Sequence, residues 1–294
     1  MTEGVIYDRG YRTYEGPRRG PAGARRAVYK EGLRRVFGLG RKARAKIFPW
    51  SMMVIGVMTA IVIVGLHFAI GQAVGDAAPV ELPRYADLFD AYSFISLIFI
   101  AYAAPQLLIP DRTNGVLSVY FSRPLTVNGY LGAKTLAYAS VVGALYIVPQ
   151  VLLHLGLGMI SRDGFFSYMT DNLDILWKVP VTTLGFVAMH GALAFFFSSF
   201  VKRPGIASAS FLGTILGANI VADQFARVDF PGSRFLTLIA PDQHPRIIRD
   251  FLFDRQGFFP ATEAGFDAWV SAIVIAVFTA LVAWFVHSRY RRLA

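Results

Sequence analysis

Six long apolar stretches, separated by polar segments, dominate the hydrophobic pattern of the chain. Each is close to the roughly 20 residues that a helix needs to cross the hydrocarbon core of a membrane. None carries Lys, Arg, Asp or Glu in its central part. Because a backbone in lipid must satisfy its hydrogen bonds within the segment, each stretch is expected to be a helix. The pattern predicts an all-α, polytopic membrane protein with spans at Trp50–Ile70, Leu88–Ile109, Thr135–Ile160, Pro180–Val201, Gly205–Ala222 and Trp269–His287.

The polar segments divide the chain into two parts. Residues 1–49 form a basic arm without a long apolar run, and residues 50–294 hold the six spans. Within the second part, a loop at 110–134 follows the second span and a longer loop at 223–268 precedes the last span. A signal peptide is not expected, because the first apolar run follows the basic arm and is longer than the core of such a peptide.

The net charge of +10 at pH 7 is a feature that nucleic-acid-binding proteins share. Here, however, 21 of the 29 basic residues lie in 1–49, 110–134, 202–204 and 288–294. These segments share one side of a six-span protein, and Lys and Arg accumulate on the cytoplasmic side of membranes. Both termini are therefore expected in the cytoplasm, with membrane lipid and not nucleic acid as the charged partner. Arg outnumbers Lys 23 to 6, which is typical of GC-rich bacteria and indicates a bacterial cytoplasmic (inner) membrane.

The stretch Arg25–Phe48 has the pattern of a basic amphipathic helix. Such a helix lies in the membrane interface with its apolar face in lipid and its arginines on anionic headgroups. An anchor without any further role has the same pattern. The apolar face comprises Tyr29, Leu33, Val36, Phe37 and Gly40, and the basic face comprises Arg25, Arg26, Lys30, Arg34, Arg35 and Arg41.

The loop at 223–268 is too long to be expected without secondary structure. Two short amphipathic helices, Ser233–Ile239 and Arg246–Phe253, are predicted on either side of Pro241. We expect both to dip into the outer leaflet. The apolar residues of the second helix are Ile247, Ile248, Phe251 and Leu252.

The loop at 110–134 is predicted to hold a short helix with Asn114 as its N-cap. A break at Arg123-Pro124 follows. Leu117, Tyr120 and Phe121 would form an apolar ridge on this helix, and an exposed apolar ridge indicates a partner.

This segment resembles the intracellular loop of type-2 ABC permeases, a family that includes many exporters. The matching positions are Asp111, Asn114-Gly115, Leu117, Ser122-Arg123-Pro124, Tyr130 and Lys134. Two positions depart from the family pattern, since Asp111 stands where Glu is common and Asn128 where a basic residue is frequent. The arm around Tyr11–Arg18 and the layout of six spans are also similar to that family. The resemblance implies a coupling helix that docks on an ATPase subunit through Asp111, Asn114, Gly115, Leu117, Tyr120, Phe121, Arg123, Pro124 and Lys134.

The resemblance further implies a transporter of four subunits, with two copies of the ATPase and a second permease, identical or related. ATP and Mg would bind the ATPase chain, because this sequence has no G-x-x-x-x-G-K-[ST] motif. The chain itself is expected to carry no cofactor and no catalytic site: it lacks cysteine, H-E-x-x-H and a Gly-x-Ser at Ser208 or Ser210. The alternatives are a non-catalytic membrane scaffold and a stand-alone channel or carrier.

A few polar residues interrupt the spans. Polar groups in lipid face the interior of a helix bundle and mark a substrate path, or they make hydrogen bonds between helices. In the fifth span, Gly213 and Gly217 belong to a stripe of small residues that suits close packing within the chain or against a second permease. The candidate path residues are Gln106, Gln150, His154, His190 and Asn219.

Overall fold

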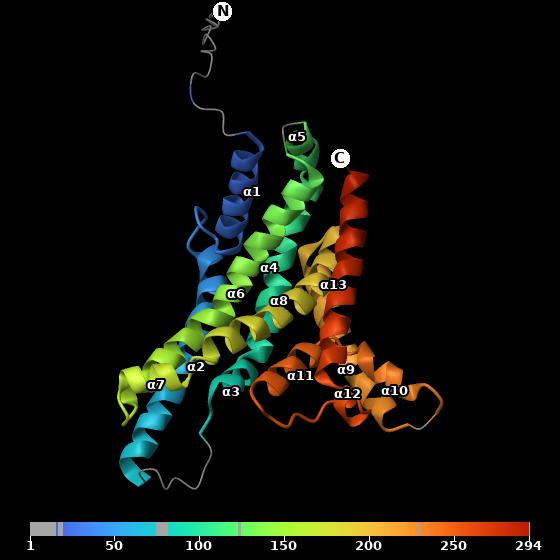
Figure 1. Cartoon of the computed structure of the whole chain (residues 1–294). Helices are drawn as coiled ribbons and strands as arrows, with labels where there is room; N and C mark the ends of the chain where they lie inside the picture. The colour runs from blue at the N-terminus through green and yellow to red at the C-terminus, as the bar shows by residue number, and fades with distance from the viewer. Residues whose placement is uncertain (1–15, 17–19, 75–81, 123–124, 229, 294) are drawn as a thin grey trace, which may run out of the picture.

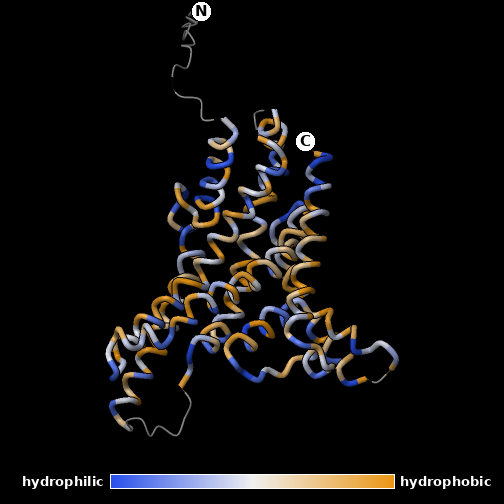
Figure 2. The backbone as a smooth tube through the Cα atoms, viewed as in Figure 1, coloured by the Kyte–Doolittle hydropathy of each residue, from blue (hydrophilic) through white to orange (hydrophobic). Residues whose placement is uncertain are grey.

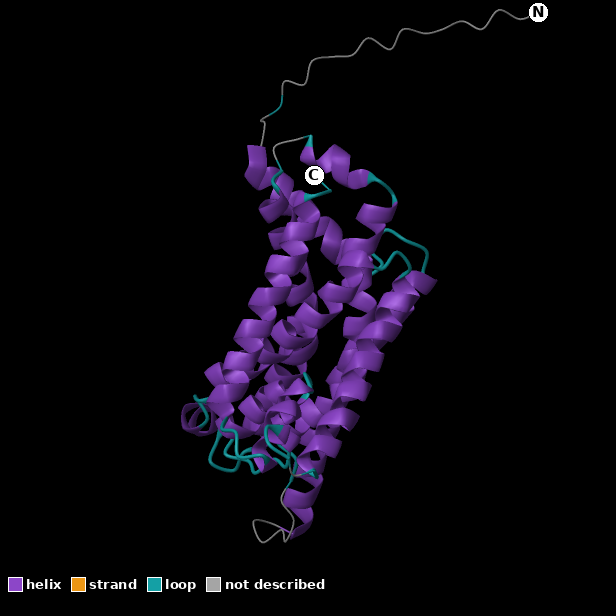
Figure 3. Cartoon of the chain, turned by 90° about the vertical axis from the view of Figure 1, so that its right-hand side faces the viewer, coloured by secondary structure: helices purple, strands orange, loops and turns teal. Residues whose placement is uncertain are grey.

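The computed structural model describes residues 16, 20–74, 82–122, 125–228 and 230–293. These residues form helices joined by turns, with no strand among them (Figures 1 and 3). The elements in chain order are α1 Gly20–Val36, α2 Arg44–Val74, α3 Tyr85–Ala91, α4 Ser93–Thr113, α5 Val116–Phe121, α6 Val127–Ile160, α7 Phe165–Asp171, α8 Ile175–Phe200, α9 Pro204–Ala226, α10 Ser233–Leu236, the 3-10 helix η2 Thr237–Ile239, α11 Gln243–Leu252, α12 Pro260–Glu263 and α13 Ala268–Arg291.

Six of these helices, α2, α4, α6, α8, α9 and α13, are long and apolar enough to cross a membrane, as the sequence predicts. The second predicted span begins too early. Residues from Leu88 to Ala91 belong to α3, and the backbone breaks at Tyr92 before α4 begins at Ser93. Several helices extend beyond their apolar stretches, and α6 begins at Val127, eight positions before the predicted span.

The long helices lie side by side, with the short helices at the two ends of the bundle (Figure 1). One end, called here the α5 end, carries α1, α5 and the last turn of α13. The opposite end, called the α11 end, carries α3, α7, α10, α11 and α12. Hydrophobic residues predominate along the long helices, and hydrophilic residues gather towards the two ends (Figure 2). This distribution is what a membrane-crossing bundle requires.

The centre of the bundle is formed by α4, α6 and α8, whose most apolar stretches are 61%, 56% and 67% buried within the chain. The corresponding figures for α2, α9 and α13 are 17%, 22% and 22%, so these three lie at the periphery. Aromatic rings fill the interior on the α11 side of the centre. Phe186 of α8 stacks on Phe89 and Tyr146 at centroid distances of 5.7 and 5.3 Å, within the range of favourable ring pairs.

The predicted helix Arg25–Phe48 is wrong in its extent, because the chain turns sharply after Val36. Gly38 and Gly40 have φ of +66° and +79°, which L side chains rarely adopt. At Gly38 an added Cβ would also lie 2.5 Å from the carbonyl oxygen of Ala45. The turn therefore depends on glycine at this position, and α2 begins beyond it.

The apolar face of α1 makes contacts with the bundle that the sequence did not predict. Val36 is fully buried, and Gly32 lies so close to α6 and α4 that an added Cβ would meet Ala137 at 2.8 Å and Leu107 at 3.1 Å. The Tyr29 hydroxyl lies 3.1 Å from Ser140 Oγ on α6. Part of the apolar face of α1 therefore packs on α6 and α4, while Tyr29, Leu33 and Phe37 remain half-buried.

In the loop before α13, the predicted short helices are present as α10 with η2 and as α11. However, α11 packs against α8 and α13 with its polar residues inward. Arg249 and Asp250 are buried, whereas Phe251 of the predicted apolar face is 69% exposed. Of the residues predicted to contact lipid, Phe251 is exposed, whereas Ile247 is buried within the protein.

Candidate functional site

Asp111 is the centre of a buried cluster at the α5 end. Its side chain is 1% exposed and lies between three partners. Arg35 Nη1 of α1 is 2.7 Å from Oδ1, Lys134 Nζ of α6 is 2.6 Å from Oδ2, and the Tyr130 hydroxyl donates to Oδ2 at 3.0 Å. Lys134 is also 1% exposed. The cluster joins α1, α4 and α6 through one carboxylate.

Arg35 is the partner that the sequence analysis assigned to lipid headgroups, and that assignment is wrong. Its side chain is 11% exposed, and it bridges Asp111 and Glu31, the latter at 3.4 Å. Burial alone would lower the pKa of the guanidinium, but the hydrogen bond and the charge of Asp111 outweigh burial and raise the pKa above its ordinary value. Arg35 is therefore held charged against Asp111.

Aromatic rings surround the Tyr130 ring beside this cluster. Tyr290 of α13 stacks on it at 5.8 Å, and the α5 residues Tyr120 and Phe121 lie at 6.0 and 5.9 Å. Lys134 Nζ lies 5.5 Å from the same centroid, in cation–π range. The aromatic contacts add α5 and α13 to the three helices that meet at Asp111.

The predicted apolar ridge of α5 is present but faces the bundle. Leu117 is buried, and Tyr120 and Phe121 are half-buried against the core, so the ridge is not an exposed surface. The exposed apolar residue of α5 is Val119, at 52%. It is accompanied by the exposed residues Asn114, Gly115, Ser118 and Ser122.

Asn114 is not the N-cap of α5. It ends α4, where its backbone N–H donates to the Pro110 carbonyl at 3.0 Å. Gly115 takes the N-cap position with φ of +69°, because the turn between α4 and α5 requires a left-handed residue. Arg123 and Pro124, two further predicted contact residues, lie outside the described residues, as does most of the arm at Tyr11–Arg18.

Two arginines that the sequence analysis left without a role join further helix ends near this cluster. Arg112 of α4 donates to the Val201 carbonyl at the end of α8. Arg289 of α13 donates to the Ser199 carbonyl of α8 at 2.8 Å. Only their placement in Lys- and Arg-rich segments, near the ends of two spans, gave a signal for this role.

The predicted path residues have different surroundings. Gln150 is buried and donates to the Tyr85 carbonyl at 2.9 Å, and His154 Nδ1 lies 2.6 Å from the Tyr85 hydroxyl. Asn219 bonds within its own helix, to the Ile215 carbonyl at 2.9 Å. Gln106 is half-buried on α4. Gln150 and His154 therefore make contacts between helices. Gln106 on α4 and Asn219 on α9 lie at less buried positions.

His190 lies in the core of α8, 1% exposed, and its Nε2 is 3.2 Å from Asp242 Oδ1. Neither ring nitrogen makes an aligned hydrogen bond among the described residues. Asp242 also pairs with Arg246 at 2.8 Å. Burial alone would raise the pKa of Asp242, but His190 and Arg246 lower it below its ordinary value.

The polar face of α11 belongs to a network of charges that the sequence analysis missed. Buried Arg249 pairs with Asp90 of α3 and with Asp250 at 2.7 Å. Arg255 reaches Asp90 and Asp87 at 3.3 Å each. The network fixes the loop before α13 onto α3, at the end of the bundle opposite Asp111 (Figure 1).

Among the described residues, no three His, Asp or Glu side chains are grouped so that they could hold a metal ion. No family model matches the chain, and no curated protein matches it.

Proposed function

We propose that the chain is the membrane-spanning subunit of an ATP-binding cassette transporter of the bacterial cytoplasmic membrane, and that it exports its substrate. In this proposal the α5 end faces the cytoplasm, where the Lys- and Arg-rich segments would be retained. A separate ATPase, present in two copies, would bind ATP and Mg and would dock on α5.

The observation that carries the proposal is the way α5 is attached. Tyr120 and Phe121 pack on Tyr130, which donates to Asp111. Asp111 pairs with Arg35 and Lys134. A force applied to the exposed side of α5 would therefore reach α1, α4 and α6 through packed and ion-paired side chains, and α13 through Tyr290. Such a rigid connection between a docking helix and the spans is what converts closure of an ATPase dimer into movement of a permease.

The periphery of the bundle is suited to a second permease. Gly205, Gly213 and Gly217 of α9 have open space where a Cβ would project, so these three glycines are not packed against another helix of the described chain. α2 is the least buried of the six long helices. Small residues permit close approach of a neighbouring helix in lipid, where packing and not the hydrophobic effect drives association.

The translocation path would run between the two permease halves. Of the candidate residues, Gln106 on α4 and Asn219 on α9 are the half-buried ones, and α4 and α9 pack side by side. Gln150, His154 and His190 are buried inside one subunit. We therefore assign the path to the α4–α9 side and a structural role to the other three.

The test is co-purification of the ATPase with this chain from a co-expressed gene pair, followed by ATP hydrolysis and transport in nanodiscs or vesicles. Val119→Asp places a charge on the exposed face of α5 and touches no buried contact. Leu173→Asp is the matched control, because Leu173 is a 56% exposed apolar residue at the α11 end. Tyr120→Ala is a poorer test, since Tyr120 also packs on Tyr130.

We expect Val119→Asp to lose the ATPase while remaining folded and Leu173→Asp to retain it in stoichiometric amount. A Val119→Asp chain that keeps the ATPase and full transport would contradict docking on α5. If the unmodified chain binds no ATPase, the alternatives apply. A chain that transports no substrate would then be a membrane scaffold, and a chain that transports substrate without ATP would be a stand-alone channel or carrier.

A further inference from the structure

We propose that a groove between α1 and the beginning of α6 binds an anionic phospholipid, with the phosphate of the headgroup on Arg25. The inference rests on the membrane-crossing character of the bundle and does not depend on the ATPase. Phospholipid is the occupant that fits, because the groove combines a cationic mouth with an apolar wall on a helix that is long and apolar enough to span a membrane.

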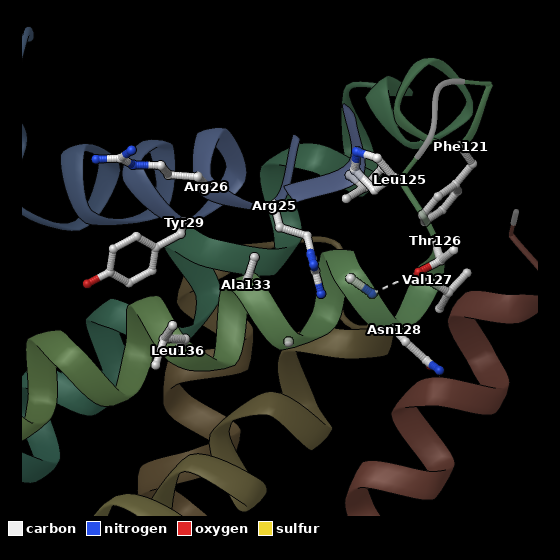
Figure 4. A pocket seen from close by; sticks show the side chains of 13 residues that line it. Arg25, Arg26, Tyr29, Phe121, Leu125, Thr126, Val127, Asn128, Ala133 and Leu136 are labelled. Carbon is white, nitrogen blue, oxygen red and sulfur yellow. Dashed lines mark hydrogen bonds between the residues drawn. The ribbon is translucent and has the colours of Figure 1, made fainter. Parts of the chain in front are cut away.

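The groove has a volume of about 1150 Å³ and lies between α1 and the first turns of α6. Residues of α1 line one side and residues of the α5–α6 connection and α6 line the other (Figure 4). The α1 side is formed by Pro21, Arg25, Arg26 and Tyr29, and the opposite side by Phe121, Leu125, Thr126, Val127, Asn128, Gly129, Gly132, Ala133 and Leu136.

The charge of the described lining residues is positive, since they include two arginines and no carboxylate. Figure 4 shows Arg25 directed from α1 towards the first turn of α6, with Arg26 farther along α1. The stem of Arg25 packs over Gly129, where an added Cβ would lie 3.2 Å from Arg25 Cγ and Cδ. Neither guanidinium is within ion-pair distance of a carboxylate among the described residues. Arg25 is therefore a positioned cation, and the adjacent N-terminus of α6 favours the same sign of ligand.

The wall below the arginines is apolar. Leu136 is 58% exposed and Ala133 lies beside it on α6, while Tyr29 presents its ring from α1. Gly132 leaves open space where its side chain would project into the groove. A free phosphate ion would use the arginines but not this wall, whereas an acyl chain would cover it. An amphiphile with a phosphate therefore satisfies both parts of the groove.

The experiment is native mass spectrometry of the full chain in detergent, titrated with phosphatidylglycerol or with phosphatidylcholine of the same acyl chains. We expect phosphatidylglycerol to bind more tightly. Arg25→Gln with Arg26→Gln should weaken it about 30-fold, the loss of one hydrogen bond between a guanidinium and the charged phosphate. Lys30→Gln with Arg34→Gln is the matched control, because both are exposed on α1 and neither lines the groove. This control should change the affinity less than about threefold, because charges exposed to solvent and outside the groove are screened.

Gly132→Leu is the second variant, and it leaves every charge in place. Its side chain fits without a clash, since nothing lies within 4 Å of the Cβ position, and it occupies the groove. We expect it to weaken phosphatidylglycerol binding by about tenfold, the loss of an apolar contact of one leucine-sized patch. It also decides the question if the double arginine variant does not fold.

Three outcomes would overturn the proposal. Equal weakening by the Lys30/Arg34 pair would reduce the site to diffuse attraction of a basic helix. Unchanged binding in Gly132→Leu would place the lipid elsewhere. Displacement of phosphatidylglycerol by glycerol 1-phosphate at a similar concentration would make the groove a site for a free anion and not for a lipid.

Discussion

Replacing Asp111 by Asn removes one negative charge from the α5-end cluster without changing the size of the side chain. The amide is able to accept from Tyr130, but it cannot neutralise Lys134, which is 1% exposed with Asp111 as its carboxylate partner at 2.6 Å. Removing one member of a buried ion pair costs about 3–5 kcal/mol, because the other charge is left uncompensated. Arg35 loses less, since Glu31 remains beside it at 3.4 Å. We therefore expect Asp111→Asn to lower the free energy of unfolding by about 3–5 kcal/mol.

The assay is reversible unfolding in mixed micelles of mild and denaturing detergent, followed by tryptophan fluorescence. Glu31→Gln is the control, because Glu31 pairs with the same arginine at 47% side-chain exposure and should matter by less than about 1 kcal/mol. Combining Asp111→Asn with Lys134→Met should cost less than the two single changes added together, since it removes both buried charges. An Asp111→Asn chain as stable as Glu31→Gln would refute the reasoning that the pair is buried and coupled.

Two further predictions concern the α11 end. Arg249→Met should lower the free energy of unfolding by about 3–5 kcal/mol, because it leaves buried Asp250 unpaired, whereas Arg227→Gln, in an exposed pair with Asp223, should stay within about 1 kcal/mol. Similar effects of the two would argue against a structural role for the network. Burial lowers the pKa of His244 below its ordinary 6.5, so its contribution to stability is complete above 6.5 and is lost as the pH falls through the lowered pKa. Amide hydrogen exchange across 237–252, corrected for its intrinsic rate, should therefore accelerate between about pH 7 and about pH 5 in the unmodified chain but not in His244→Gln. The same pH dependence of exchange in both proteins would contradict this prediction.

The six long helices were predictable because lipid imposes one requirement, a continuous apolar stretch with internal hydrogen bonds. The break at Tyr92 was not, since apolar residues lie on both sides of it and the break depends on the local backbone angles of Tyr92, φ −116° and ψ 17°. Helix ends beyond the apolar stretch, such as the turns of α6 before Lys134, carry no hydropathy signal either.

The α5-end cluster was predictable in some of its members but not in its arrangement. The motif gave Asp111, Tyr130 and Lys134 together, whereas Arg35 was expected on lipid headgroups. Hydropathy does not say whether the apolar ridge of α5 meets a partner or its own bundle. The packing of α1 was not predictable for the same reason. A basic amphipathic sequence pattern is the same whether the apolar face of the helix contacts lipid or protein. Arg35 and Asp111 are 76 residues apart, and only the tertiary structure pairs them.

The charged network of α11 had no signal in the sequence. Arg249 and Asp250 in a polar loop have the composition of a solvated surface, and their burial follows from the packing of α11 on α8 and α13. Asp90, which pairs with Arg249, precedes it by 159 residues. Patterns of period 3.6 locate an apolar face, but they do not reveal a helix that turns its charges inward.

The position of α1 has a consequence for biogenesis. This helix leaves the ribosome before the helices that it packs against, because the contacts of its Arg35 and Tyr29 with Asp111 on α4 and Ser140 on α6 span 76 and 111 residues. Until the second span is synthesised, Glu31 is the described carboxylate beside Arg35, because Asp111 lies at the end of α4. Until the third span is inserted, the apolar face of α1 lacks its neighbour α6. The nascent chain must therefore hold α1 at the membrane surface and release it to α6 late, which makes docking of α1 a step that reports completion of the first three spans.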